Sequence, residues 1–260
     1  NTSFDFTGGI SSEIPAIIND VWVDPANGVN EGNIIGDINN PFLTIDYAMG
    51  MIYSTEENPV TIHLASGTYS PETGESFPII MMDNLSIEGT FEENNNLELP
   101  HIDAMETNRV ITMVGCTGNS ISNVVIKNGY FAGEDLCNND MSCLGGGMYL
   151  KYSNPTLYNV EFRNNYAYYG GGGIYMENSQ PSLFEVNIIG NTSSHGDGGG
   201  IYMTDNSDAI MSNMSFLNNY GEDGAALLIV DSSPLITNTT IEASNTGLGW
   251  NNFTGTAVLV

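Results

Sequence analysis

The segment Gly171-Gly172-Gly173-Ile174-Tyr175-Met176 decides the fold, because the chain contains it more than once. The pattern occurs before it at Gly145–Leu150 and after it at Gly198–Met203, with a degenerate copy at Gly224–Ile229. The first large apolar residue after the glycines recurs at steps of 26, 27 and 26 residues. These equivalent positions are Met148, Ile174, Ile201 and Leu227. A fifth copy begins at Gly255 and places Val258 in the same phase after a step of 31 residues. A fixed period of this size is typical of a solenoid.

Each copy has a second half. The matching segments are Pro155–Phe162, Pro181–Ile188, Ala209–Phe216 and Pro234–Ile241. An asparagine follows each of the first three, at Asn165, Asn191 and Asn219. One unit therefore consists of a strand, an Asn/Ser turn, a second strand and an Asn/Gly turn, with room for a third short strand.

Short runs with period-2 alternation, bounded by Gly, Pro, Asn and Ser, indicate strands. Repeated strands without helical segments can close as the rungs of a parallel β-helix, in which equivalent residues stack about 4.8 Å apart. Stacked asparagines would then share amide hydrogen bonds between rungs. A β-sandwich is the alternative, but it gives no reason for a pattern that recurs at fixed spacing. We therefore predict an all-β solenoid.

The solenoid should have three parts. We expect an extended arm at 1–20, an N-terminal cap with irregular rungs at 21–100, and regular rungs at 101–260 interrupted by a loop inserted at 130–144. Residues 41–53 form the one convincing helix, for which Thr44 is a good N-cap. Its apolar face would cover the open end of the core, which a solenoid requires.

Charge excludes several functions. The 260 residues include 4 Lys plus Arg and 31 Asp plus Glu, which gives a formal net charge of −27. Nucleic acids and anionic lipids are bound through basic clusters, which this composition cannot supply. No apolar run approaches the length of about 20 residues that spans a bilayer. We therefore expect no nucleic-acid partner and no membrane span.

Cys137 and Cys143 lie close together in the sequence. In an oxidising compartment they can close a small disulfide loop, and the alternative is two free thiols in a mobile loop. Cys116 is left over and is expected to be a small buried hydrophobe.

Stacked acidic residues are candidates for a cation site. Asp197 and Asp223 precede the glycine corner of consecutive rungs, and Asp205 and Asp231 follow the first strand of the same rungs. Carboxylates at one-rung spacing repel each other unless one is protonated or a cation bridges them, and such oxygen ligands favour Ca²⁺. Alternatively, these residues are ordinary solvated corners or a glycosidase carboxylate pair.

Three tyrosines occupy one phase, namely Tyr149, Tyr175 and Tyr202. If the flanking Ile and Met residues point inward, these rings should stack on the outer face. They would form either an intramolecular ladder or an exposed stripe for a glycan or a protein partner. The histidines, in contrast, lie on separate segments, and neither His63, His101 nor His195 has an evident Ser or Cys partner.

Apolar residues at the two ends suggest assembly. The N-terminal arm contains Phe4, Phe6, Ile10 and Ile14, and the unfinished last rung contains Val258 and Val260. A donated arm could complete the last rung of another copy and give head-to-tail filaments, or the natural chain could continue beyond Val260.

The segments Val21–Gly28, Gly36–Ile45 and Ile62–Tyr69 resemble the opening of secreted right-handed parallel β-helix proteins. The repeats resemble those of polymorphic outer-membrane proteins and pectate-lyase-like proteins, so that the resemblance covers about residues 21–260. It implies a right-handed, single-stranded β-helix at an extracellular or cell-surface location. Activity is not implied, because these families include lyases, hydrolases, adhesins and structural surface proteins.

Two functions remain. Lyases of this kind use a basic residue, and the chain offers only Arg109, Lys127, Lys151 and Arg163. We therefore expect a non-catalytic surface module for adhesion or filament formation, with copies of itself, the remainder of a longer surface protein or a glycan as partner. The alternative is a carbohydrate-active enzyme, either a lyase or a glycoside hydrolase, or a glycan-binding β-helix.

Overall fold

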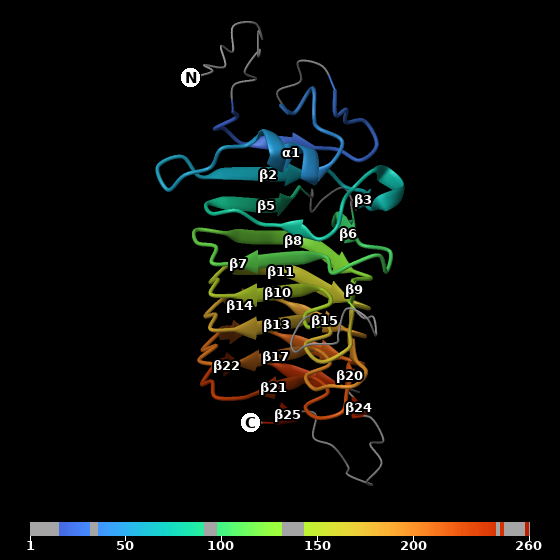
Figure 1. Cartoon of the computed structure of the whole chain (residues 1–260), viewed down its shortest axis with the longest axis vertical. Helices are drawn as coiled ribbons and strands as arrows, with labels where there is room; N and C mark the ends of the chain where they lie inside the picture. Colours follow the sequence, from blue (N-terminus) through green and yellow to red (C-terminus); the bar gives the residue numbers. More distant parts are fainter. Residues whose placement is uncertain are drawn as a thin grey trace, which may run out of the picture.

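The computed structural model describes residues 16–31, 36–90, 98–131 and 143–242, together with the backbone of 245–246 and 258–259. The chain winds into a tall stack of parallel coils, with the first coils at one end and the last coils at the other (Figure 1). Every strand pair is parallel and joins successive coils, which confirms the predicted all-β solenoid.

The first sheet is the longest and contains thirteen strands. Its main path is β1 (Val21–Val23), β2 (Val60–Leu64), β5 (Leu85–Gly89), β8 (Ser120–Lys127), β11 (Thr156–Arg163), β14 (Ser182–Phe184), β18 (Ile210–Ser212) and β22 (Leu235–Thr237). Beside this path lie β3 (Thr68–Tyr69), β6 (His101–Asp103), β15 (Asn187–Ile189), β19 (Ser215–Leu217) and β23 (Thr240–Glu242). The irregular N-terminal rungs and the regular rungs therefore share one continuous sheet.

Two further sheets complete each coil. The second contains β4 (Ile79–Ile80), β7 (Ile111–Val114), β10 (Met148–Lys151), β13 (Ile174–Glu177), β17 (Ile201–Thr204), β21 (Leu227–Ile229) and β25 (Val258–Leu259). The third contains β9 (Tyr130–Phe131), β12 (Tyr166–Ala167), β16 (Thr192–Ser193), β20 (Tyr220–Gly221) and β24 (Asn245–Thr246). The predicted phase is confirmed by the register, since Met148, Ile174, Ile201 and Leu227 are partners along the second sheet.

The predicted asparagine ladder is present inside the coils. The Nδ2 of Asn165 donates to Oδ1 of Asn191 at 2.9 Å, and the Nδ2 of Asn191 donates to Oδ1 of Asn219 at 3.1 Å. All three side chains are at most 1% exposed. The backbone N–H groups of Asn165 and Asn191 donate to the same two oxygens, Oδ1 of Asn191 and Oδ1 of Asn219. The buried amides of the ladder therefore have hydrogen-bond partners in the neighbouring coils.

A serine ladder, which the sequence analysis missed, runs in parallel. Ser179 accepts the backbone N–H of Ser153, Ser207 accepts that of Ser179, and Ser232 accepts that of Ser207. Cys116 is at the head of this ladder, because its backbone N–H donates to Oγ of Ser153 at 3.0 Å. Its free thiol is 5% exposed and contacts the carbonyl of Met81, as expected for a small buried side chain.

The N-terminal helix is shorter than predicted. Helix α1 spans Ile45–Met51, since Phe42 forms a bridge with Val23 and Ile52 is extended. Thr44 is the N-cap, as expected, and accepts the N–H of Tyr47. Glu75, which follows the short 3₁₀ helix η1 (Pro71–Thr73), accepts the N–H groups of Ile45 and Asp46, so that its buried carboxylate supports the helix N-terminus. Burial nevertheless outweighs these hydrogen bonds and raises the pKa of Glu75.

The insertion is also narrower than the predicted 130–144. Tyr130 and Phe131 form β9 and pair with β12, while Leu144 forms a bridge with Gly170. Both ends therefore belong to the rungs. Cys143 is disulfide-bonded, whereas its expected partner Cys137 lies outside the described residues. The pairing of these two cysteines stays a prediction.

Of the predicted assembly residues, Val258 belongs to the described part of the chain. The residues Phe4, Phe6, Ile10, Ile14 and Val260 lie outside the described part of the chain. Val258 begins β25 and pairs with Leu227, which continues the second sheet by one strand. Among the helices within the described ranges, none is long and apolar enough to cross a membrane.

Replacing Asn191 tests the ladder. Asn191→Ala removes the acceptor of Asn165 and the donor to the carbonyl of Phe162, and leaves buried polar groups without partners. We expect the free energy of unfolding to fall by about 3 kcal/mol, measured by urea denaturation. Asn187→Ala, in the outward-facing row of the same coil, is the control and should cost about 0.5 kcal/mol. Equal effects of the two substitutions would contradict a stabilising role for the ladder.

The disulfide can be tested by intact-mass measurement after alkylation of the denatured protein. Without reductant, one alkylated thiol is expected, that of Cys116, whereas reduction should expose all 3 cysteines. Alkylation of both Cys137 and Cys143 before reduction would show that they are not joined.

Candidate binding site

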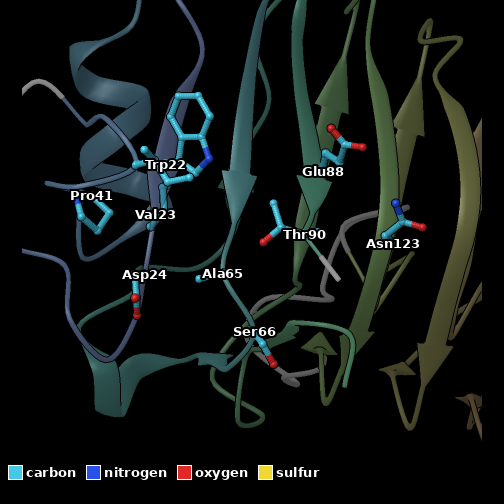
Figure 2. A pocket seen from close by; sticks show the side chains of 11 residues that line it. Trp22, Val23, Asp24, Pro41, Ala65, Ser66, Glu88, Thr90 and Asn123 are labelled. Carbon is cyan, nitrogen blue, oxygen red and sulfur yellow. The ribbon is translucent and has the colours of Figure 1, made fainter. Parts of the chain in front are cut away.

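A groove lies on the outer face of the first sheet, across β1, β2, β5 and β8 (Figure 2). Alternation along parallel strands directs one residue of each strand outward at the same level. Trp22 pairs in register with His63, His63 with Glu88, and Glu88 with Ser122. These four residues form an outward row on successive strands, and two of them, Trp22 and Glu88, line the groove.

The groove has a volume of about 810 Å³. Its polar lining consists of Asp24, Ser66, Glu88, Thr90 and Asn123, and Trp22 supplies the aromatic wall. Its close packing depends on Gly89, because a Cβ there would lie 1.8 Å from the carbonyl oxygen of Asn123. A concave, mixed polar and aromatic surface of this size is suitable for a small ligand or a segment of a polymer.

His63 connects the aromatic and acidic parts of this surface. Its ring stacks on Trp22 with 4.8 Å between centroids and an interplanar angle of 24°. Its Nε2 lies 3.6 Å from Oδ2 of Asp20, and its Nδ1 lies 3.3 Å from Oε2 of Glu88. Each ring nitrogen of His63 therefore faces a different carboxylate.

Asp24 contributes a fixed negative charge. Its Oδ1 accepts the N–H groups of Ala26 and Asn27, and its Oδ2 accepts the Nδ2 of Asn27 at 2.9 Å. Burial raises the pKa of Asp24, but these three hydrogen bonds together outweigh it and lower the pKa. Asp24 is therefore ionised at neutral pH.

Tyr69 holds the strand ends below the groove. Its hydroxyl contacts the carbonyl of Val23 at 2.8 Å and that of Ala65 at 3.0 Å. Burial, together with the charges of Asp24 and Glu75, raises the pKa of Tyr69, so the hydroxyl keeps its proton. The ends of β1 and β2 are thereby tied together at the wall that Trp22 and Asp24 form.

A second hollow of about 520 Å³ adjoins the groove at Trp22. It also includes Ile18, Asp20, Glu57 and Asn58. Trp22 thus takes part in two neighbouring depressions, and acidic side chains line both.

The predicted tyrosine stripe is in register but is not an exposed surface throughout. Tyr149 stacks on Tyr175 with 5.5 Å between centroids, and Tyr175 meets Tyr202 edge-on at 5.4 Å. Tyr175 is only 3% exposed, because the rings of the rungs above and below pack against it. The expectation of an open stripe is wrong at this position, and the arrangement corresponds to the intramolecular ladder.

Of the predicted cation residues, Asp197 and Asp223 contact each other on consecutive rungs. The backbone N–H of Asp223 donates to Oδ1 of Asp197 at 3.1 Å, and burial together with the charges of Asp223 and Glu222 raises the pKa of Asp197. Asp205 and Asp231 have φ values of 53° and 47°, a left-handed conformation that Asp tolerates better than most residues. No group of three His, Cys, Asp or Glu side chains suited to a metal occurs among the described residues. Calcium binding stays a prediction.

His195 has a partner that the sequence analysis missed. Its Nδ1 lies 2.9 Å from Oγ of Ser194, and its ring stacks on Tyr168 with 4.3 Å between centroids. Ser194 also contacts the hydroxyl of Tyr166. The expectation that His195 has no Ser partner is therefore wrong, since the adjacent residue in the turn provides one.

The basic residues are all engaged away from the groove. Lys127 pairs with Asp103 at 3.2 Å, Lys151 with Glu177 at 2.6 Å, and Arg163 with Glu161 at 2.5 Å. Arg109 donates to the carbonyls of Leu144 and Gly145 and lies over the ring of Phe131. All four therefore have structural contacts in the middle coils.

The groove was not predicted from the sequence. The spacing of 25 residues between His63 and Glu88 equals about one rung and could have indicated that they are neighbours. Trp22 is separated from His63 by a longer connection that contains α1, so no repeat relates the two positions.

The family model for the right-handed β-helix region matches residues 109–258. The chain belongs to the right-handed β-helix family. No curated protein sequence matches it.

Solved structures that are similar include pectin methylesterase PemA from Erwinia chrysanthemi, at 15% identity and a TM-score of 0.53, with 86% of this chain and 66% of that chain covered. The pectin methylesterase from Aspergillus niger has 12% identity and a TM-score of 0.45, with 92% and 88% covered. These likenesses concern the fold alone, and this chain spans just under two thirds of the length of PemA.

Calcium can be tested by thermal unfolding in millimolar Ca²⁺ and in chelator. A cation that bridges the acidic ladders would stabilise the native state by about 1–2 kcal/mol at ten- to thirtyfold excess over its dissociation constant, and so raise Tm by a few degrees. The double variant Asp197→Asn/Asp205→Asn should lose this rise. The same Tm in Ca²⁺ and in chelator would mean that these carboxylates are ordinary solvated surface.

Proposed function

We propose that this protein is an extracellular or cell-surface adhesion module that binds a glycan in the groove around Trp22 without cleaving it. Trp22 is the observation that carries the proposal. Its indole lines a groove in which Asp24, Ser66 and Asn123 supply hydrogen-bonding groups. Sugars combine apolar faces with hydroxyl groups, so an aromatic wall beside polar side chains is complementary to them.

The same residues favour binding over catalysis. A glycoside hydrolase needs a protonated carboxylic acid as well as a carboxylate. The lowered pKa of Asp24 suits a permanent anion, and Glu88 faces His63. The similar fold of pectin methylesterases agrees with a carbohydrate ligand but carries no residue roles to this chain.

The remaining coils would act as a scaffold. Ladders of buried asparagine and serine connect one coil to the next and keep the outer face in a fixed register. A rigid rod that presents a binding site near one end is suited to attachment at a surface. Contacts with other copies, or with further parts of a longer surface protein, would then lie at the ends of the rod.

Trp22→Ala tests this function. Binding to a panel of soluble neutral, acidic and amino polysaccharides is measured by affinity electrophoresis. The variant should bind its polysaccharide at least about tenfold more weakly, since loss of the aromatic wall costs about 1.4 kcal/mol or more. Tyr53→Ala is the control, because Tyr53 is 62% exposed and does not line the groove.

Circular dichroism should show that both variants keep the fold. If wild-type protein binds no polysaccharide of the panel, or if Trp22→Ala binds as well as wild type, the groove is not a glycan site. Release of reducing ends or of acid from the bound polysaccharide would show catalysis and overturn the non-catalytic part of the proposal.

A further inference from the structure

We infer that the glycan of this groove carries protonated amines, so that its class is a cationic amino-sugar polymer. The inference rests on the proposed glycan-binding function and narrows its ligand. Three observations carry it: the aromatic wall of Trp22, the acidic side chains on both sides of that wall, and the position of every Lys and Arg in the sequence.

The concave surface combines an aromatic ring with separate carboxylates. Asp24 and Glu88 line the groove, and Asp20 and Glu57 line the adjoining hollow. Trp22 belongs to both depressions. In Figure 2, Trp22, Asp24 and Glu88 come from different parts of the groove wall, with Thr90 between the two carboxylates in this view. An ammonium group is bound well by an indole face beside carboxylates, through cation–π attraction and charge-assisted hydrogen bonds.

No Lys or Arg precedes residue 109 in the sequence to offset this charge. The first Lys or Arg in the sequence is Arg109, whereas the groove is built from residues before it and from Asn123. Among the described residues that line the groove and the hollow, none is Lys or Arg. The potential at Trp22 is therefore negative, which attracts a cationic ligand and repels a uronate.

Among the described residues, the basic group close to these carboxylates is His63. It faces Asp20 and Glu88, so a protonated His63 would compete with a ligand amine for the same oxygens. Among the contacts described, His63 pairs with neither Asp24 nor Glu57. Hydrogen bonds from Ala26 and Asn27 lower the pKa of Asp24 and keep it ionised. The groove therefore keeps part of its negative charge when His63 is protonated.

The test is calorimetric titration of the full chain with three oligosaccharides of equal length, made of glucosamine, N-acetylglucosamine or galacturonic acid. At a pH where the amines are protonated, the glucosamine oligomer should bind at least about tenfold more tightly than its N-acetylated counterpart, which has lost the charge. The galacturonic acid oligomer should bind most weakly. Raising the salt concentration should weaken only the interaction with the amine.

Variants separate the groove from general attraction between a cation and an acidic protein. Glu88→Gln should weaken glucosamine-oligomer binding by about three- to tenfold and should change binding of the N-acetylated oligomer less, because the amide keeps a hydrogen-bonding group and loses only the charge. Glu72→Gln, at an exposed position outside the groove, removes the same charge and should have no effect. Trp22→Ala should reduce binding of the amine as well.

The outcomes distinguish the inference from the function on which it rests. If the N-acetylated oligomer binds as tightly as the amine and depends on Trp22, the cationic ligand is wrong and the glycan site stands. If Glu72→Gln weakens binding as much as Glu88→Gln, the attraction is non-specific and the inference fails. If none of the oligomers binds, the inference is wrong, and the proposed function is also wrong only if no polysaccharide of the panel above binds.

Discussion

The structure depends on hydrogen bonds that run along the axis of the stack, from a side chain in one coil to the equivalent position in the next. Asn191 shows the constraint, because its amide joins the coil above through Asn165 and the coil below through Asn219. A buried amide that misses a partner costs the full desolvation free energy, so neighbouring coils must keep the same register. The near-constant period of the sequence follows from this requirement, and the serine ladder imposes it a second time in each coil.

The register of the interior determines the outer face. Since inward and outward residues alternate, a fixed interior places one outward residue of each strand directly beside the next. In the regular coils this produces the tyrosine ladder, in which the burial of Tyr175 leaves little surface for a ligand. In the first coils, the connections through α1 and η1 interrupt the repeat, and a groove forms that Trp22 and Glu88 help to line. The part of the chain that departs from the repeat is thus the part suited to binding.

This division explains how far the sequence could be interpreted. The register of the second sheet and the asparagine ladder both follow from the period, because they depend on local pattern and stacking alone. The site depends on contacts between positions that no repeat relates, such as Trp22 and His63. Exposure likewise depends on how the whole molecule packs. The period predicts that Tyr175 is in register with Tyr149 and Tyr202, but it does not predict that the neighbouring rings bury Tyr175. Ser194 and His195 are adjacent in the chain. Their side-chain contact depends on local conformation, which gives no periodic signal in the sequence.

The distribution of charge follows the same division between scaffold and site. Lys127, Lys151 and Arg163 each contact a carboxylate in the middle coils, and the guanidinium of Arg109 holds the carbonyls at the base of the insertion. These cations therefore neutralise charge where coils pack closely. The first coils have no such cation, and there the hydrogen-bonded turn of Asp24 keeps its carboxylate ionised beside an aromatic wall. Asp24 and Glu88 line the groove, and Asp20 lines the adjoining hollow, so negative charge gathers on both sides of Trp22. A cationic ligand of the kind proposed above would offset that charge, so the same carboxylates that remain without a Lys or Arg neighbour would give the groove its selectivity.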